Sequence, residues 1–139
     1  PAIHIEAGGA EVALELDVLS EKDVARARVS VRELCQKLGA RPLSLQKIAT
    51  IVSELARNMV LYAGGGKLAI RPCDGGRRCL HVMSRDQGPG IKNLPEIMSG
   101  KYKSRSGLGL GLLGSKRLAD KFDIETGPAG TRVEVEVTY

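Results

Sequence analysis

The stretch Asp86-Gln87-Gly88-Pro89-Gly90-Ile91, followed later by Gly107-Leu108-Gly109-Leu110-Gly111, is the most informative part of this chain. An acidic residue opens the first glycine-rich turn, and the second glycine run opens a segment whose pattern predicts a helix. Glycine lets the backbone approach a ligand closely, and a helix N-terminus offers free N–H groups that suit phosphate. The two segments therefore predict a nucleotide site, with Asp86 at the base and the later glycines at the phosphates.

Two better-known nucleotide fingerprints do not fit this chain. The sequence contains no G-x-x-x-x-G-K-[ST] segment, which excludes a P-loop. Gly109, Gly111 and Gly114 match G-x-G-x-x-G, but a Rossmann site needs a strand directly before its first glycine. Here the basic, polar segment 101–106 precedes the glycines, so we reject the Rossmann interpretation.

Bulk properties indicate one ordinary domain spanning residues 1–139. The 139 residues are 42% hydrophobic, which allows a real core and argues against disorder. The formal charge of +5 is compatible with an anionic ligand, but aromatic residues make up only 3%, so platforms for stacking nucleic-acid bases are scarce. No apolar run reaches the length of a membrane span. We expect neither a nucleic-acid nor a membrane partner.

The three cysteines, Cys35, Cys73 and Cys79, are odd in number and show no C-x-x-C spacing. This pattern gives little support to a metal site or a disulfide framework. The N-terminus also lacks the basic-then-apolar pattern of a signal peptide. Together these features predict a protein of the reducing cytoplasm.

Hydrophobic periodicity predicts an α/β (α+β) two-layer sandwich with a mixed, mostly antiparallel sheet. Residues 11–18 alternate strictly between apolar and polar, as a half-buried strand does, and apolar residues in 24–38 and 45–59 follow helical spacing. The predicted strands are 3–5, 11–18, 67–71, 78–84, 124–126 and 132–137, and the main helices are about 21–38, 42–62 and 111–121. A short segment around 94–98 lies between the two glycine motifs.

Glu54 and Asn58 stand four residues apart on the second predicted helix, so they share one face. An amide oxygen suits a hard cation such as Mg²⁺, and a carboxylate can accept a proton from an attacking hydroxyl. Taken alone, this pair favours a solvated helix edge, and Asp86 alone is also explained as a turn residue, because Asp-x-Gly turns are common.

Three ordered motifs resemble the N, G1 and G2 boxes of the GHKL ATPases, which include gyrase B, Hsp90, MutL and the histidine kinases. They are Glu54-Leu55-Ala56-Arg57-Asn58, Asp86-Gln87-Gly88-Pro89-Gly90 and Gly107-Leu108-Gly109-Leu110. Thr131, after Gly130, is similar to the late Gly-Thr element of that family. The resemblance covers about residues 50 to 137 and implies a Bergerat-type ATP-binding fold with helices on one face of the sheet.

Within that superfamily, the chain resembles the anti-sigma and switch-protein serine kinases of bacterial partner switching, and most closely the switch kinase of the stressosome. It shows no helical dimerisation segment with a phospho-acceptor histidine and no additional domains, so we do not expect a histidine kinase or a gyrase relative. The resemblance implies an ATP-dependent protein serine/threonine kinase whose partners are STAS-domain proteins and a PP2C-type phosphatase, with a sigma factor as the second choice.

Two alternatives stay open at this point. A nucleotide-gated binding module would sequester its partner with little or no phosphoryl transfer. A degenerate domain would keep the fold but bind no nucleotide, which the presence of Glu54, Asn58 and Asp86 argues against.

The resemblance also implies a role for each site residue, with ATP and Mg²⁺ as cofactors. Glu54 is the expected catalytic base, Asn58 the Mg²⁺ ligand, and Asp86 the acceptor for the adenine amino group. Thr131 is expected to support Asp86, and Arg105 to contact the γ-phosphate as a second catalytic residue. The glycines fall into two groups, which shape the base pocket (Gly88 and Gly90) and pack against the phosphates (Gly107, Gly109 and Gly111).

Overall fold

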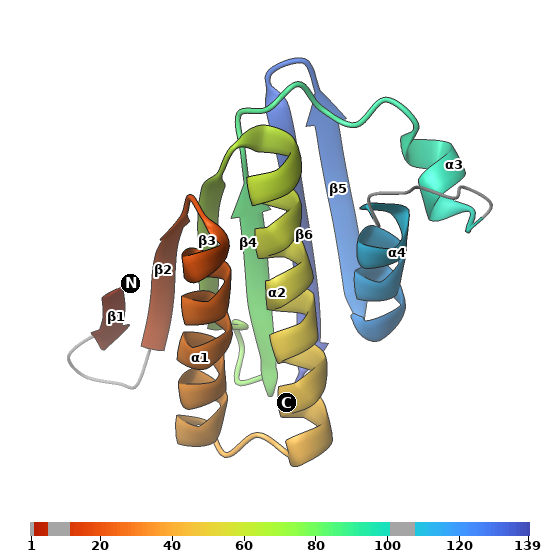
Figure 1. Cartoon of the computed structure of the whole chain (residues 1–139). Helices are drawn as coiled ribbons and strands as arrows, with labels where there is room; N and C mark the ends of the chain where they lie inside the picture. The colour runs from red at the N-terminus through yellow and green to blue at the C-terminus, as the bar shows by residue number, and fades with distance from the viewer. Residues whose placement is uncertain (1, 6–11, 101–107) are drawn as a thin grey trace.

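The chain runs through a pair of strands, two long helices, a hairpin, two further helices and a final hairpin (Figure 1). This computed structural model describes residues 2–5, 12–100 and 108–139, and the side chains of 14–100 and 111–139. The elements are β1 (Ala2–Ile5), β2 (Val12–Val18), α1 (Glu21–Lys37), α2 (Pro42–Ala63), β3 (Gly66–Pro72), β4 (Cys79–Arg85), α3 (Leu94–Met98), α4 (Leu108–Leu118), β5 (Lys121–Gly127) and β6 (Gly130–Thr138).

The strands form one sheet in the order β1-β2-β3-β4-β6-β5. Each neighbouring pair of described strands is antiparallel, so the sheet is uniform where a mixed one was expected. The long connection through α1 and α2 joins β2 to β3, and α3, α4 and β5 lie between β4 and β6 in the chain. This order brings the end of β4 beside the start of β6, where Arg85 is the register partner of Arg132.

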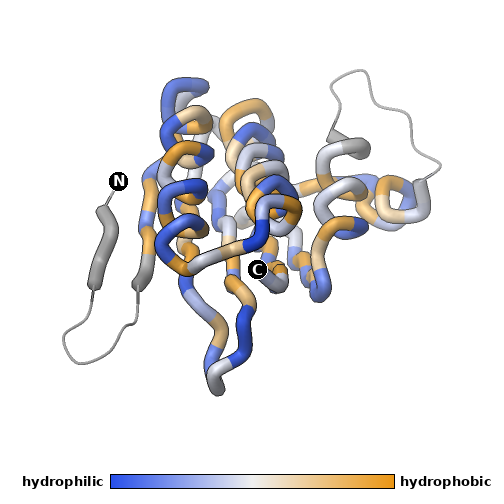
Figure 2. Tube along the Cα trace, turned by 90° about the horizontal axis from the view of Figure 1, so that it is seen from below, coloured by the Kyte–Doolittle hydropathy of each residue, from blue (hydrophilic) through white to orange (hydrophobic). Residues whose placement is uncertain are grey.

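Helices α1 and α2 cover one face of the sheet, which confirms the two-layer arrangement (Figure 2). Alternation in β6 places Val133, Val135 and Val137 in the core, while Glu134 and Glu136 lie on the opposite, open face. The helices contribute buried residues at three- and four-residue spacing, such as Val31 in α1 and Leu55 in α2. Removing these apolar surfaces from water is the main force that holds the two layers together. None of the helices in the described ranges is long and apolar enough to cross a bilayer.

Two helix boundaries follow their sequence signals, and a third does not. Gly39, which follows the C-cap residue of α1, and Gly64, the C-cap of α2, adopt φ values of +71° and +74°, where glycine ends a helix at little cost. The last helix, expected at 111–121, occupies Leu108–Leu118 instead. The N–H of Asp120 donates to the Glu136 carbonyl at 2.8 Å, so pairing with β6 replaces the next helical turn.

A disulfide joins Cys73 to Cys79 at the end of the β3–β4 hairpin, so the expectation of unpaired cysteines is wrong for this pair. The two Cα atoms lie 5.4 Å apart because the hairpin register brings them together. Cys35 is a free thiol in the core, and burial raises its pKa to about 11. That thiol is therefore protonated and unreactive at neutral pH.

Candidate nucleotide-binding site

Asp86 lies directly after β4 and is hydrogen-bonded to the first residues of β6. Its Oδ1 atom accepts hydrogen bonds from the N–H of Gly88, at 3.0 Å, and of Thr131, at 3.1 Å. The N–H of Asp86 in turn donates to the Thr131 carbonyl at 3.0 Å. Both described hydrogen bonds of the carboxylate use the same oxygen, which leaves the second oxygen to meet a ligand. The predicted proximity of Asp86 and Thr131 is therefore found in the structure.

A pair of hydroxyl groups extends this attachment to the loop after Asp86. The Oγ1 atoms of Thr131 and Thr126 lie 2.8 Å apart, and Thr126 Oγ1 accepts from the N–H of Ile91 at 2.8 Å. Thr126 was missed in the sequence, although it mirrors Thr131 across the turn between Gly127 and Gly130 and is its register partner. The β5–β6 hairpin thus holds the Asp86 loop at both of its ends.

Glycines are required here because backbone approaches backbone with no room for a side chain. A methyl group on Gly130, whose φ is +141°, would overlap the carbonyl oxygen of Asp86. One on Gly90, with φ +84°, would overlap the carbonyl oxygen of Gly127, and one on Gly88 would lie 2.6 Å from the Ala63 Cβ. The glycine motif therefore packs the loop against α2 and against the β5–β6 turn.

A narrow cavity opens between this loop, α2, α4 and the sheet. The space between the atoms that surround it measures about 430 Å³. The part that the centre of a water molecule can occupy measures about 30 Å³. Its lining is mostly apolar with a few polar groups, as is usual for small-molecule pockets, and comprises Leu55, Asn58, Met59, Tyr62, Ala63, Ser84, Asp86, Gly88, Pro89, Gly90, Ile91, Leu112, Thr131 and Val133. A flat ring system that reached Asp86 would enter by displacing the flexible apolar side chains of this lining.

Two buried polar atoms of α2 face this cavity without a hydrogen-bond partner among the described residues: Asn58 Nδ2 and Tyr62 Oη. An unpaired buried polar atom is costly, so both atoms mark places where a ligand can supply the missing bond. Tyr62 was missed in the sequence, yet it extends the four-residue spacing of Glu54 and Asn58 along the same helix face.

Glu54 lies one turn before Asn58, at the edge of the cavity rather than in its lining. Its Oε1 atom accepts a hydrogen bond from Arg57 Nη1 at 3.2 Å, and its side chain is 32% exposed. Gly111 of α4 packs against this helix face, since a methyl group there would lie 2.7 Å from Glu54 Oε2 and 3.6 Å from Asn58 Oδ1. The carboxylate and the amide thus converge on the backbone of the second glycine run.

These oxygens fit a hard cation, because Mg²⁺ binds carboxylate and amide oxygens and keeps water and phosphate as its other ligands. Asn58 is the residue that would hold it. Of the remaining predicted site residues, Gly109 lies within α4, whereas Arg105 and Gly107 fall outside the residues that the structure describes.

The fold and this cavity define an ATP-binding domain. Residues 18–137 match the histidine kinase-like ATPase domain, and the chain belongs to this family. Within it, the chain is 38% identical over 120 residues to the serine/threonine-protein kinase RsbT of Bacillus subtilis (strain 168), an alignment that covers 86% of this chain and 90% of RsbT. The chain is therefore a protein serine/threonine kinase of the GHKL type, as the sequence motifs predicted.

Solved structures agree with this fold. The RsbU and RsbW domains of Rv1364c from Mycobacterium tuberculosis match 94% of this chain with a TM-score of 0.65 and 17% identity, and this chain spans a third (33%) of that protein. The structure of the SiaB–SiaC complex from Pseudomonas aeruginosa matches 91% of this chain and 89% of its own, with a TM-score of 0.62 and 13% identity. At such low identity these two likenesses concern the fold alone.

Proposed function

We propose that this kinase transfers the γ-phosphoryl group of ATP to a serine or threonine hydroxyl of a STAS-domain protein in a bacterial partner-switching pathway that responds to stress. The identity to RsbT and the resemblance to switch-protein kinases support this substrate class. The observation that carries the proposal is the convergence of Glu54 and Asn58 on Gly111, beside the cavity that Asp86 closes.

The base and the phosphates of ATP have separate supports in this arrangement. The second oxygen of Asp86 accepts from the adenine amino group, and Thr131 lines the same cavity. We assign the binding of the phosphates to the amides of residues 107–111 and that of the γ-phosphate to Arg105, as the family resemblance implies. Asn58 would hold Mg²⁺, which would supply positive charge to offset the charge that develops on the phosphate oxygens.

Glu54 acts on the acceptor hydroxyl. Its carboxylate takes the proton as the hydroxyl oxygen forms a bond to the γ-phosphorus, and the bond from that phosphorus to the bridging oxygen breaks to release ADP. Phosphoryl transfer depends chiefly on position and charge, and the rigid turn from Glu54 to Asn58 supplies the position. Arg57, which pairs with Glu54 at 3.2 Å, keeps the carboxylate oriented between turnovers.

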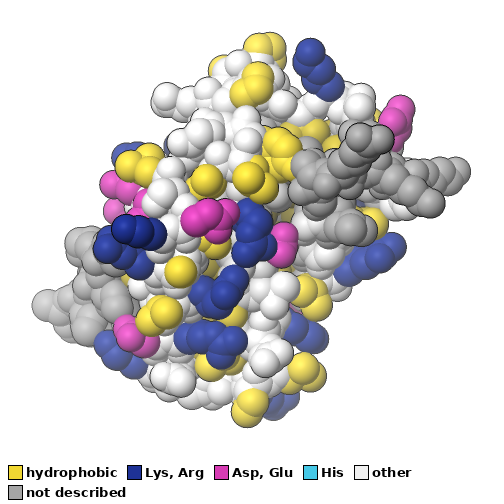
Figure 3. Space-filling model, in the orientation of Figure 1, with side chains coloured by type: hydrophobic (Ala, Val, Ile, Leu, Met, Phe, Trp, Pro, Cys, Tyr) yellow, Lys and Arg dark blue, Asp and Glu magenta, His cyan; other side chains and the backbone are white. Residues whose placement is uncertain are grey.

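The acceptor segment approaches Glu54 from the face of α1 and α2, where basic side chains gather (Figure 3). A groove there is lined by Arg28 and Arg32 of α1 and by Ser53 and Glu54 of α2. Arg28 Nε donates to Ser53 Oγ at 2.8 Å, which holds the two helices together beside Glu54. After transfer, the released kinase activates a PP2C-type phosphatase; a sigma factor is the second choice of partner.

Glu54→Ala tests the proposal directly. We expect transfer of labelled phosphate to a purified STAS protein to fall by about 10²–10⁴-fold, with ATP binding by calorimetry nearly unchanged. Asn58→Ala is expected to lower both Mg-ATP binding and transfer. Glu33→Ala, which removes a carboxylate from the exposed side of α1, is the matched control and keeps wild-type activity.

A Glu54→Ala protein that phosphorylates its partner at the wild-type rate would remove Glu54 from the reaction. A wild-type protein that binds ATP, binds the STAS protein and transfers nothing would favour the nucleotide-gated binding module instead.

A further inference from the structure

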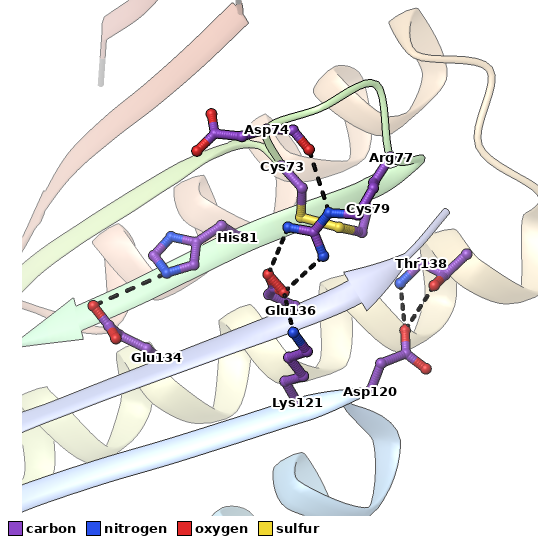
Figure 4. A network of polar contacts seen from close by, with 10 residues as sticks. All are labelled: Cys73, Asp74, Arg77, Cys79, His81, Asp120, Lys121, Glu134, Glu136 and Thr138. Carbon is purple, nitrogen blue, oxygen red and sulfur yellow. Dashed lines mark hydrogen bonds and ion pairs between the residues drawn. A yellow bond between two sulfur atoms is a disulfide. The ribbon is translucent and has the colours of Figure 1, made fainter.

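Strand β4 begins at Cys79 and ends just before Asp86, so its first residues lie far from the Asp86 pocket. A cluster of side chains with metal-binding atoms lies there (Figure 4). The disulfide of Cys73 and Cys79 closes the β3–β4 hairpin there, and Glu136 of β6 lies beside it. The two sulfur atoms and a carboxylate oxygen of Glu136 all lie within 4.8 Å of one another. Neither ATP binding nor phosphoryl transfer uses this cluster.

The two cysteines stay adjacent when the disulfide is reduced, because the backbone holds them independently. The N–H of Cys73 donates to the Cys79 carbonyl at 2.8 Å, and Pro72 pairs with Leu80 in the next register position. Reduction therefore leaves two thiols fixed on the same hairpin, beside a carboxylate.

His81 of β4 is a fourth possible ligand, opposite Glu136 of β6. His81 follows Cys79 by two residues on β4, so both side chains leave the same face of the sheet, and its register partner is Glu136. His81 Nε2 now lies 4.0 Å from Glu134, a contact loose enough for the ring to turn toward Glu136. Two sulfurs, one imidazole nitrogen and one carboxylate oxygen form a set that favours Zn²⁺.

The surroundings suit an anionic ligand set. Arg77 and Lys121 lie 3.2 Å and 3.8 Å from Glu136 and offset the negative charge of thiolates and carboxylate. Cys79 is 7% exposed and the Glu136 side chain 17%, which shields the ligands from water, whereas Arg77 is 53% exposed and can move aside.

We propose that reduction of the Cys73–Cys79 disulfide converts this cluster into a Zn²⁺ site with Cys73, Cys79, Glu136 and His81 as ligands. A dithiol reductant supplies two electrons and two protons, which break the S–S bond into two thiols, and the reductant becomes its own disulfide. Zn²⁺ then binds both sulfurs as thiolates and releases the two thiol protons. The oxidised protein lacks the sulfur ligands and does not bind the ion.

Cobalt is the probe for the test, because Co²⁺ bound by thiolates absorbs strongly. The full chain is reduced with a dithiol, freed of reductant without oxygen, and titrated with Co²⁺ and then Zn²⁺. We expect one Co²⁺ per reduced chain with thiolate charge-transfer bands, displacement by Zn²⁺, and no bands in the oxidised protein. Cys73→Ser abolishes the bands, and Cys35→Ala, which removes the thiol outside the cluster, leaves them unchanged.

Glu136→Gln and His81→Ala keep both hairpin thiols and are expected to weaken Co²⁺ binding by about tenfold or more. The proposal is overturned if the reduced wild type shows no saturable thiolate bands, if the bands survive in Cys73→Ser, or if both Glu136→Gln and His81→Ala bind as tightly as wild type. This titration uses no ATP and no partner, so its outcome is independent of the kinase proposal.

Discussion

The two ends of strand β4 are built on different principles. At the end that leads to Asp86, backbone packs against backbone, and the glycines at 88, 90 and 130 leave no space for a side chain. At the other end, Gly75 and Gly76 have open space around them, and a disulfide and ion pairs on Glu136 hold the strands together. The first end has no room for a larger residue at these glycines. At the second end, the disulfide and each ion pair can be removed by a separate substitution.

The difference matters because one end of β4 shapes the ligand pocket, whereas the other end contributes to the stability of the fold. A pocket for a flat base needs a rigid lining. Close packing of backbone against backbone provides that rigidity before the ligand binds. Charged and covalent links at a distant hairpin stabilise the fold without shaping that pocket. Each of the following substitutions either breaks this separation or measures it.

Gly130→Ala is expected to have the largest effect. The new methyl group would overlap the Asp86 carbonyl oxygen at a φ of +141°, so the loop must move. We expect a loss of about 3 kcal/mol in unfolding free energy and loss of ADP binding, measured by urea denaturation and calorimetry.

Gly75→Ala is the matched control for Gly130→Ala, because its φ is +75° but nothing lies within 4 Å of the new methyl group. It isolates the conformational cost of about 1–2 kcal/mol and leaves ADP affinity intact. If Gly130→Ala and Gly75→Ala lost the same unfolding free energy, the loop at Gly130 would have to accommodate the new methyl group without an energetic cost.

Asp86→Asn acts on binding rather than on the fold. The amide oxygen can still accept from Gly88 and Thr131, but the amide NH₂ replaces the oxygen that would meet the adenine amino group. We expect ADP affinity to fall by roughly 1.5–3 kcal/mol while the urea midpoint barely moves. Asp123→Asn, on the exposed side of β5, is the control; unchanged ADP affinity in Asp86→Asn would remove this residue from the site.

Cys73→Ser is expected to show the reverse pattern. Loss of a disulfide that closes so short a loop costs about 2 kcal/mol of stability, and ADP affinity should match that of wild type because the hairpin lies at the far end of β4. Urea denaturation of oxidised and reduced wild type gives the same comparison without a substitution. A fall in ADP affinity would show that the two ends are coupled.

Acid is expected to produce the smallest effect, confined to the hairpin end. Arg77 lowers the folded pKa of Glu136 below its ordinary value of 4.5, so the stabilisation is present above that value and is lost as pH falls through the folded pKa. Glu136→Gln should therefore flatten the decline of stability below pH 4.5, measured by urea denaturation. Asp120, whose pKa is lowered by hydrogen bonds from Thr138, keeps part of the decline in that variant. An unchanged slope would contradict the prediction.

The positions of the residues at the Asp86 end could be predicted from the sequence because they belong to short contiguous motifs. Asp86, Gly88 and Gly90 lie within five residues, and the spacing of Glu54 and Asn58 fixes a shared helix face whatever the rest of the chain does. The roles of all these site residues remain predictions, and Arg105 and Gly107 also lie outside the described ranges.

The features that the sequence did not predict depend on how the strands pair with one another and with neighbouring loops. The disulfide requires the register that brings Cys73 to Cys79, which C-x₅-C spacing does not reveal. The Thr126 hydroxyl accepts a hydrogen bond from Ile91, thirty-five residues away in the chain, a contact that the sequence does not reveal. The end of α4 is set by competition with β6, because Asp120 bonds to Glu136 rather than continuing the helix.

Helix α2 carries Glu54, Asn58 and Tyr62 at successive four-residue steps, with Ile51 and Leu55 of the same helix fully packed in the core. The proposed catalytic base, the proposed metal ligand and core residues therefore share one segment, so a fluctuation that unfolds this helix disrupts all three in a single event. Heat inactivation is expected to coincide with exchange of the α2 amides with solvent deuterium, with no partly active intermediate before it. A ligand that slows that exchange would lengthen the working lifetime of the kinase to the same degree.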